Sequence, residues 1–236
     1  MLLIVTMAKN NQVLNEQIQY YRARAPEYDE WFFRQGRYFY GEEHKQKWFS
    51  EAAIVEKALM DSKPSGQILE FACGTGVWTE KIAPFADKMT AIDTSPEAIA
   101  LCKKKLQAST IEYIQHNIFD WVPQQQYDFI FFGFWLSHVP LESFDAFWEL
   151  VRSSIKPEGS LFFVDSLFAV DSSARDNRPV DKSGIVERKL NNGDQYHIVK
   201  IFHKPDELKE RLSKLGWSGF VRKSGRFFIY GSLSIA

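Results

Sequence analysis

The chain has 236 residues, with 29 Lys or Arg against 30 Asp or Glu, and its net charge is −1. This balance lacks the basic excess that holds a nucleic-acid backbone, so we expect no nucleic-acid partner. The length suits one structural domain with appendages. The longest early apolar run, at 2–5, is far short of the roughly 20 residues that span a bilayer, and we expect no membrane association.

The cysteine and histidine content indicates the compartment and argues against a metal. Two cysteines, Cys73 and Cys102, provide no disulfide framework and favour a reducing, cytoplasmic location. The cysteines and histidines do not have the spacing of a zinc site, so we expect no metal. We expect a monomer or a homodimer.

Residues 12–50 precede the first predicted strand and hold eleven aromatic side chains. We predict that residues 1–50 form a helical cap. Two roles are open for its aromatic residues, which either pack on the sheet or form a lid over a bound ligand. Both roles can hold at once.

Apolar runs and helical patterns alternate through the middle of the chain. The runs predict strands at 67–73, 89–93, 110–114, 127–133 and 160–165, and the patterns between them predict helices at 76–84, 96–107 and 142–155. The run at 127–132 is nearly continuous in apolar residues, as expected for a central parallel strand covered on both faces. Residues 156–159 are predicted to interrupt the chain. The alternation predicts a doubly wound α/β sheet.

The C-terminal part has a different pattern. Asn192-Gly193 lies between alternating runs at 185–190 and 195–202, which is a strong hairpin signal. A helix is predicted at 205–215, ended by Gly216, and a strand at 226–232. We therefore predict a sheet domain over residues 51–236, with a hairpin insertion at about 183–203. Together with the cap it forms one structural domain.

A glycine turn and an acidic residue predict a nucleoside-binding site. A mostly apolar strand leads into Gly74-Thr75-Gly76, and Asp93 ends the next apolar run. Glycine lets backbone N–H groups approach a ligand that a side chain would keep away. A carboxylate at the tip of the following strand can accept hydrogen bonds from both hydroxyls of a ribose. Together these features predict a crevice at the carboxyl ends of parallel strands.

The residues around the turn distinguish between two nucleosides. The dinucleotide fingerprint has a third small residue where this chain has Thr79, and Trp78 adds bulk where a pyrophosphate needs room. Glu70 precedes the turn and would repel a pyrophosphate, whereas it suits the amino group of an amino acid. These features disfavour a nicotinamide oxidoreductase. They favour S-adenosylmethionine, which carries an amino acid, a ribose and an adenine but no phosphate.

The pattern Glu70-x-x-x-Gly74-x-Gly76, followed by Asp93, resembles motifs I and II of the class I S-adenosylmethionine-dependent methyltransferases. The resemblance implies a Rossmann-like seven-stranded sheet with an antiparallel edge. It also implies S-adenosylmethionine as cofactor, S-adenosylhomocysteine as product, and a set of cofactor-binding residues. These are Tyr21, Tyr28, Glu70, Ala72, Gly74, Thr75, Gly76, Trp78, Asp93, Thr94, Asn117, Ile118 and Phe134. Asn117 replaces the aspartate usual at the adenine site, but its amide oxygen can still accept from the adenine amino group.

From about Tyr20 onward the chain is similar to a narrower group, the phosphonate O-methyltransferase of dehydrophos biosynthesis. The most selective matches are Trp135-Leu136-x-His138-Val139-Pro140 and the late hairpin. The similarity implies a set of substrate-binding residues, the last three of which are also implied to be catalytic. They are Tyr38 or Tyr40, Trp135, His138, Arg188 and Lys200.

Methyl transfer to an anionic oxygen needs orientation rather than a base, because that oxygen is already ionised at neutral pH. Arginine offers a planar fork that matches an oxyanion, and lysine offers a point charge. Arg188 and Lys200 lie on opposite arms of the hairpin, where their facing depends on the turn register. The alternative is that both are solvated strand charges. His138 is either a packing residue, a donor to an oxyanion, or a base for a hydroxyl.

We therefore predict an S-adenosylmethionine-dependent O-methyltransferase that acts on an anionic oxygen, phosphonate or carboxylate, of a small molecule. Phe134 and Trp135 occupy the place where enzymes that methylate amino groups of bases carry Asn/Asp-Pro-Pro-Tyr, which argues against such a substrate. Two alternatives are a methyltransferase for a hydroxyl or amine of a small metabolite and a non-catalytic nucleoside-binding protein.

Overall fold

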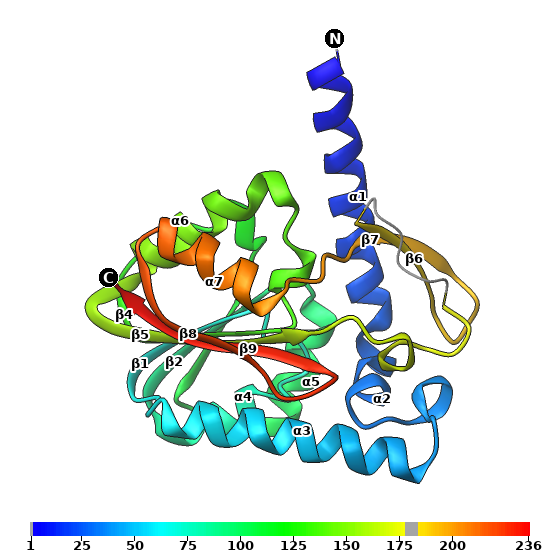
Figure 1. The fold of residues 1–236 in the computed structure, drawn as a ribbon, viewed down its shortest axis with the longest axis horizontal. Coiled ribbons are helices and arrows are strands. Elements are labelled where there is room, and N and C mark those ends of the chain that lie inside the picture. The colour runs from blue at the N-terminus through cyan, green and yellow to red at the C-terminus, as the bar shows by residue number, and fades with distance from the viewer. Residues whose placement is uncertain (1, 178–183) are drawn as a thin grey trace.

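The computed structural model describes residues 2–177 and 184–236, with side chains from Gln12 onward. Its centre is a seven-stranded sheet with the order β3-β2-β1-β4-β5-β9-β8 (Figure 1). The first five strands in this order pair in parallel, and β9 is antiparallel to β5 and β8. The strands are β1 (Gly66–Phe71), β2 (Ala86–Asp93), β3 (Ile111–Gln115), β4 (Tyr127–Gly133), β5 (Ile155–Ser166), β8 (Trp217–Lys223) and β9 (Phe228–Ile235). The predicted Rossmann-like sheet is confirmed.

Helices cover both faces of this sheet (Figure 1). Side chains of α3, α4 and α5 pack on one face, and those of α6 and α7 pack on the other. The helices are α1 (Leu2–Arg24), α2 (Tyr28–Phe32), α3 (Glu42–Asp61), α4 (Thr79–Ile82), α5 (Pro96–Leu106), α6 (Phe144–Ser154) and α7 (Pro205–Lys214). The start of α5 is set by Ser95, whose Oγ accepts a 3.0 Å hydrogen bond from the Ala98 amide.

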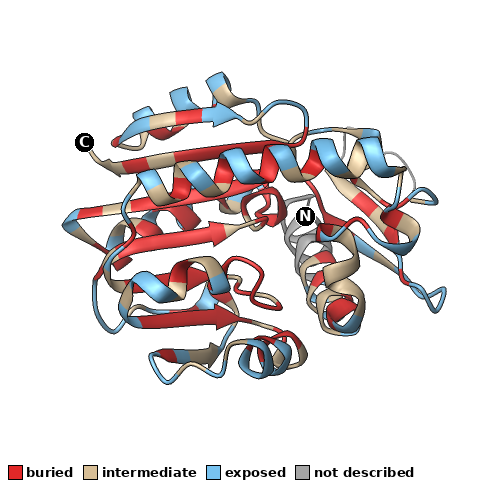
Figure 2. Ribbon diagram, turned by 90° about the horizontal axis from the view of Figure 1, so that it is seen from below, coloured by how far each residue is buried: buried red, intermediate tan, exposed pale blue. Residues whose placement is uncertain are grey.

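The apolar run in β4 is explained by cover on both faces of the sheet. Side chains of a strand alternate between faces, so Phe131 stacks on Phe162 on one side and Phe132 on Phe163 on the other. All four are fully buried, and Figure 2 shows buried strands beneath helices that expose one side. Each buried phenylalanine contributes roughly 1.5–3 kcal/mol to folding.

Three elements of the main sheet and its helices differ clearly from the expectation. The helix expected at 76–84 is reduced to α4, because Pro84 lies in a 3₁₀ turn directly after it. β5 begins at Ile155 and runs through the expected interruption at 156–159, where its pairing with β4 is irregular. β8 is an additional strand, and its apolar pattern is weak because this edge strand buries only Trp217 and Val221.

The N-terminal region and the hairpin lie together at one end of the sheet (Figure 1). The hairpin strands β6 (Ile185–Lys189) and β7 (Gln195–Val199) form a separate two-stranded sheet that packs on α1. The expected hairpin is therefore present, while residue 183, at its expected start, lies outside the described residues. β7 ends at Val199 rather than at 202, because the Ile201 amide donates to the Ser137 carbonyl. The long helix α3 runs across residue 50, the expected boundary of the cap.

Candidate functional site

Two adjoining cavities lie at the carboxyl ends of the parallel strands. The glycine-turn cavity has a volume of about 570 Å³ and is lined by Gly74, Asp93 and their neighbours. The hairpin cavity has a volume of about 870 Å³ and lies between α1, the hairpin and the segment after β5. Four residues line both cavities, namely Tyr21, Tyr28, Phe134 and His138.

The glycine turn presents bare backbone to its cavity. Gly74 has a φ of +55° and Gly76 a φ of +86°, which glycine adopts without strain. A Cβ at Gly74 would meet no atom within 4 Å, whereas a Cβ at Gly76 would lie 2.6 Å from Cys102 Sγ. Two other lining residues, Ala72 and Phe134, have φ of +57° and +56°, a strained backbone of the kind that clusters at functional sites.

Asp93 connects the turn to the start of α5. Its Oδ2 accepts from the Gly74 amide at 2.8 Å, and its Oδ1 accepts from the Ser95 amide at 2.9 Å. Burial raises the pKa of Asp93, although these two N–H groups act in the opposite direction. Each carboxylate oxygen has a further lone pair. Asp93 can therefore accept hydrogen bonds from a ligand in the glycine-turn cavity, beside Thr94 and Ile118.

Glu70 lies in a smaller cavity of about 330 Å³ that is also lined by Gly74, Trp78 and Phe134. Its side chain is almost fully buried, and its Oε2 accepts from Thr79 Oγ1 at 2.7 Å. Burial raises the pKa of Glu70 to about 8. The carboxyl is therefore mostly protonated at pH 7, and a ligand cation beside it would favour its ionised form.

The other predicted cofactor-binding residues also line these cavities, except Gly76 and Asn117. Asn117 Oδ1 accepts from the Phe119 amide at 3.2 Å, and its Nδ2 donates to Asp120 Oδ2 at 2.7 Å. Its side chain caps the 3₁₀ turn that follows β3. Ser95 was not predicted but lines the glycine-turn cavity. Its position two residues after Asp93 is the feature of the sequence that could have indicated its place in the site.

His138 is hydrogen-bonded on both ring nitrogens. Its Nδ1 lies 2.6 Å from the Val199 carbonyl, which only accepts, so the ring proton is on Nδ1. Its Nε2 then accepts from the Tyr21 hydroxyl at 2.8 Å. Burial, with a contribution from Lys200, holds the pKa of His138 well below its usual value. The imidazole is therefore neutral. In this tautomer its N–H group, at Nδ1, points to the Val199 carbonyl and not toward Tyr21.

Arg188 and Lys200 share one face of the hairpin and both line the hairpin cavity. In the register of the hairpin Arg188 lies opposite Tyr196, and alternation places residues 196, 198 and 200 on the same side. The two cations thus lie on the same face of the hairpin without being a directly opposed pair. Both are buried, so the alternative of solvated strand charges is wrong.

Lys200 makes more contacts than Arg188. Its Nζ donates to Ser137 Oγ at 2.8 Å and lies 3.7 Å from Asp165 Oδ1. Burial lowers the pKa of Lys200 to about 8, and the charge of Arg188 acts in the same direction. Arg188 Nη1 donates to the Glu187 carbonyl at 3.2 Å, and burial lowers its pKa. An anion in the cavity would stabilise both charges.

The structure places the tyrosine and tryptophan residues that were predicted to bind substrate at different sites. Tyr38 lines the hairpin cavity, whereas Tyr40 stacks near His44 and does not line it. Trp135 lines the glycine-turn cavity and packs on Phe119. Tyr38 is therefore the tyrosine that the fold brings to the cationic residues.

Several lining residues of the hairpin cavity were missed by sequence reasoning, and Arg24 is the most notable. A lone arginine at the end of a helix is usually a solvated residue that complements the helix dipole. The residue stands within the stretch from Tyr20 onward that carries the narrower resemblance. That stretch was the signal available in the sequence.

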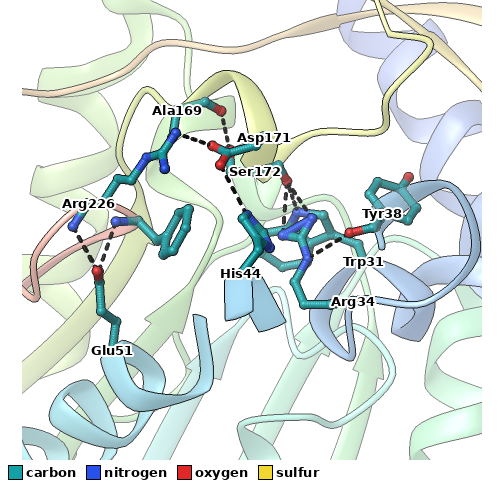
Figure 3. A network of polar contacts seen from close by, with 10 residues as sticks. Trp31, Arg34, Tyr38, His44, Glu51, Ala169, Asp171, Ser172 and Arg226 are labelled. Atoms are coloured by element: carbon teal, nitrogen blue, oxygen red, sulfur yellow. Dashed lines mark hydrogen bonds and ion pairs between the residues drawn. The ribbon is translucent and has the colours of Figure 1, made fainter. Parts of the chain in front are cut away.

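One wall of the hairpin cavity is tied to the N-terminal region (Figure 3). The carbonyl of Ser172 accepts from both terminal nitrogens of Arg34, at 3.2 and 3.1 Å, and from Trp31 Nε1 at 2.8 Å. The neighbouring Asp171 lies 3.3 Å from His44 Nε2. These contacts hold the segment after β5 against the helices that close the cavity.

Known proteins resemble this chain in sequence and in structure. Residues 68–159 match the methyltransferase domain family. Nodulation protein S of Sinorhizobium fredii is 35% identical over 68 residues, which cover 28% of this chain and 32% of the relative. Malonyl-[acyl-carrier protein] O-methyltransferase 1 of Ilyobacter polytropus is 32% identical over 96 residues, 36% of each protein. The chain thus spans about a third of the length of these curated relatives.

Two solved structures match nearly the whole chain. The DhpI–SAH complex is 36% identical, with a TM-score of 0.78, and the match covers 95% of this chain and 97% of that one. The DhpI–SAM–HEP complex is 37% identical, with the same TM-score and with coverage of 94% and 97%. The chain belongs to the class I S-adenosylmethionine-dependent methyltransferases. It is an enzyme whose methyl donor is S-adenosylmethionine and whose donor product is S-adenosylhomocysteine.

The described residues contain neither a membrane-spanning helix nor a cluster of metal-ligating side chains. None of their helices has the length and apolar character needed to cross a membrane. Among the same residues, no three or more His, Cys, Asp or Glu side chains gather in a way that could hold a metal ion.

Proposed function

We propose that this enzyme transfers a methyl group to an anionic oxygen, phosphonate or carboxylate, of a small molecule. The observation that carries the proposal is the pair of buried cations, Arg188 and Lys200, in the cavity that adjoins the glycine turn. Buried cations need anionic partners, and of these two cations Lys200 lies 3.7 Å from a carboxylate oxygen of Asp165. An anionic acceptor would supply the remaining negative charge.

The residues of the glycine-turn cavity fit the cofactor. Asp93 would accept from the ribose hydroxyls, and Glu70 would face the ammonium of the methionine part. The bare backbone at Gly74 leaves room for the chain between them. When bound, S-adenosylmethionine supplies an activated sulfonium methyl group. Phe134 and Trp31, packed edge to face with their centroids 4.6 Å apart, would surround this cation with aromatic rings.

The hairpin cavity would orient the acceptor. An ionised oxygen needs no base, so the work of the protein is alignment and exclusion of water, which can lower a barrier by roughly 7–11 kcal/mol. The fork of Arg188 and the point charge of Lys200 would fix the oxyanion. Tyr21 and His138, which line both cavities, would stand at the position where donor and acceptor meet. DhpI, the solved relative, is known in a complex with SAM and HEP, and two adjoining cavities here would hold two ligands together.

A second candidate is supported by His138. A neutral imidazole whose Nε2 accepts from the Tyr21 hydroxyl could take up a proton through that hydroxyl. Such a path would serve an acceptor that carries a neutral hydroxyl. It is of no use to an oxygen that is already ionised.

The test is a turnover screen that measures release of S-adenosylhomocysteine. Small phosphonates, carboxylic acids, phenols and amines are offered to the wild type and to Arg188→Met. We expect turnover with an anionic acceptor and a loss of at least about tenfold in kcat/KM in the variant. As a matched control, Arg222→Met removes an arginine stacked on Phe220 in the edge strand β8, outside both cavities. Turnover confined to phenols or amines, unchanged in Arg188→Met, would refute the proposal.

A further inference from the structure

The hairpin cavity holds a third cation, Arg24, with little to balance its charge. It is the last residue of α1, it lines the cavity, and only 8% of it is exposed. Its Nε is buried without a hydrogen-bond partner, and its Nη2 donates to the Tyr38 hydroxyl at 3.3 Å. The guanidinium carbon lies 5.4 Å from the ring centroid of Tyr20 and 4.9 Å from that of Tyr28.

Positive charge exceeds negative charge in this cavity. The described residues of its lining include three cations, Arg24, Arg188 and Lys200, and no Asp or Glu. Asp165 balances Lys200 from behind. Tyrosines supply no negative charge near neutral pH, since burial raises the pKa of Tyr20 to about 12. Among the described residues that line the cavity, none balances the charges of the two arginines, so a ligand would compensate them.

From this imbalance we infer that Arg24 is an acceptor-binding residue and that the acceptor is a small dianion. The inference rests on the proposed function and restricts its acceptor from any anionic small molecule to a dianion. The two negative charges would come either from one doubly ionised phosphonate or from two carboxylates. The unpartnered Nε of Arg24 is the donor that such a ligand would satisfy. Arg24 and Arg188 then bind the dianion from two sides, α1 and the hairpin.

Methyl transfer changes this charge balance. The carbon–sulfur bond breaks with its electrons going to sulfur, and an oxygen lone pair forms the new carbon–oxygen bond. The sulfonium becomes a neutral thioether, and the dianion becomes a monoanionic methyl ester. The ester has one negative charge fewer than the acid to interact with the positive charges of Arg24 and Arg188. It is therefore bound more weakly than the acid, which favours product release.

Calorimetry on the full chain saturated with S-adenosylhomocysteine tests this inference. The probes are methylphosphonate and succinate, each compared with its own monomethyl ester at pH 8. We expect the wild type to bind one of the two acids at least about 30-fold more tightly than its ester, given the strength of charged hydrogen bonds. Which acid does so distinguishes the two sources of the dianion.

The variant Arg24→Met tests the residue. We expect the ratio of acid to ester affinity to fall below about threefold in this variant. Its affinity for S-adenosylhomocysteine, measured on the same sample, should stay within about twofold of wild type, which would report an intact fold. Arg24→Lys keeps the charge without the fork and should give an intermediate ratio. The matched control is Arg211→Met, which removes an arginine stacked on Phe144 and paired with Asp145, away from both cavities.

The outcomes separate the inference from the proposed function. A wild type that binds acid and ester equally well, or an Arg24→Met variant that keeps the wild-type ratio, overturns the inference alone. A wild type that binds neither acids nor esters overturns the inference and the proposed function together.

Discussion

Replacing Glu70 by Gln tests the electrostatics of the cofactor site. Glu70 is almost fully buried and accepts from Thr79 Oγ1 at 2.7 Å. Glutamine retains an oxygen that can accept this hydrogen bond, and its NH₂ group takes the place of the protonated carboxyl oxygen. The variant is thus a mimic of protonated Glu70 that cannot ionise.

The magnitude follows from the shift in pKa. Burial raises the pKa of Glu70 from 4.5 to about 8, so the folded state binds this proton more tightly than the unfolded state does. The resulting stability is present below the unfolded pKa and is lost as the pH rises through the folded pKa. At 1.36 kcal/mol per pKa unit, the free energy of unfolding of the wild type should fall by about 4 kcal/mol relative to Glu70→Gln between pH 5 and pH 9.

Urea denaturation of both proteins at pH 5, 7 and 9 measures this difference, because all other titrations cancel between them. Parallel pH profiles would refute the reasoning. Calorimetry adds a second readout, since the ammonium of S-adenosylhomocysteine should ionise Glu70. At pH 7, binding should release close to one proton from the wild type and none through this group in Glu70→Gln. Equal proton release would show that Glu70 does not face the ammonium.

Three further substitutions have defined outcomes. Asp93→Ala should weaken binding of S-adenosylhomocysteine by about 100-fold or more in calorimetry, because it removes the acceptor for the ribose; unchanged affinity would contradict that role. Gly76→Ala should lower the free energy of unfolding by about 1–3 kcal/mol, since its Cβ would lie 2.6 Å from Cys102 Sγ. Adding Cys102→Ala should recover part of this loss in urea denaturation, and no recovery would show that the contact is not the cause. Tyr21→Phe should lower the free energy of unfolding by about 1–3 kcal/mol, because it leaves the buried Nε2 of His138 without a donor. Urea denaturation that matches the wild type would show that this hydrogen bond does not stabilise the fold.

The sheet was predictable because its signals are local. The Gly74-Thr75-Gly76 turn, the acidic residue Asp93 and the continuous apolar run of β4 each depend on residues that are adjacent in the chain. The same holds for the hairpin, whose Asn192-Gly193 turn is a short-range signal. Each of these features appears in the structure at the expected place.

The errors have a common cause, which is that tertiary contacts replaced local preference. β8 was missed because only two of its side chains are buried, one of them Trp217, which packs against Trp148 from another element. Residues 156–159, where Pro157 and Gly159 favour a break, form an irregular stretch within β5, which pairs with β4 at Ile155 and again from Ser160 onward. The expected contact of Asn117 with the adenine stays a prediction, because the amide oxygen that accepts from the Phe119 amide has a second lone pair.

The sequence by itself determined the class of enzyme, because the glycine turn and Asp93 form their site through one strand–turn–helix unit and its neighbour. Only the tertiary structure decided which charged side chains line the hairpin cavity. Arg24 and Arg188 come from opposite ends of the chain, and they line one cavity because α1 packs on the same hairpin face that carries Arg188 and Lys200. The neutral state of His138 likewise depends on burial and on the Val199 carbonyl, which folding alone brings to its ring.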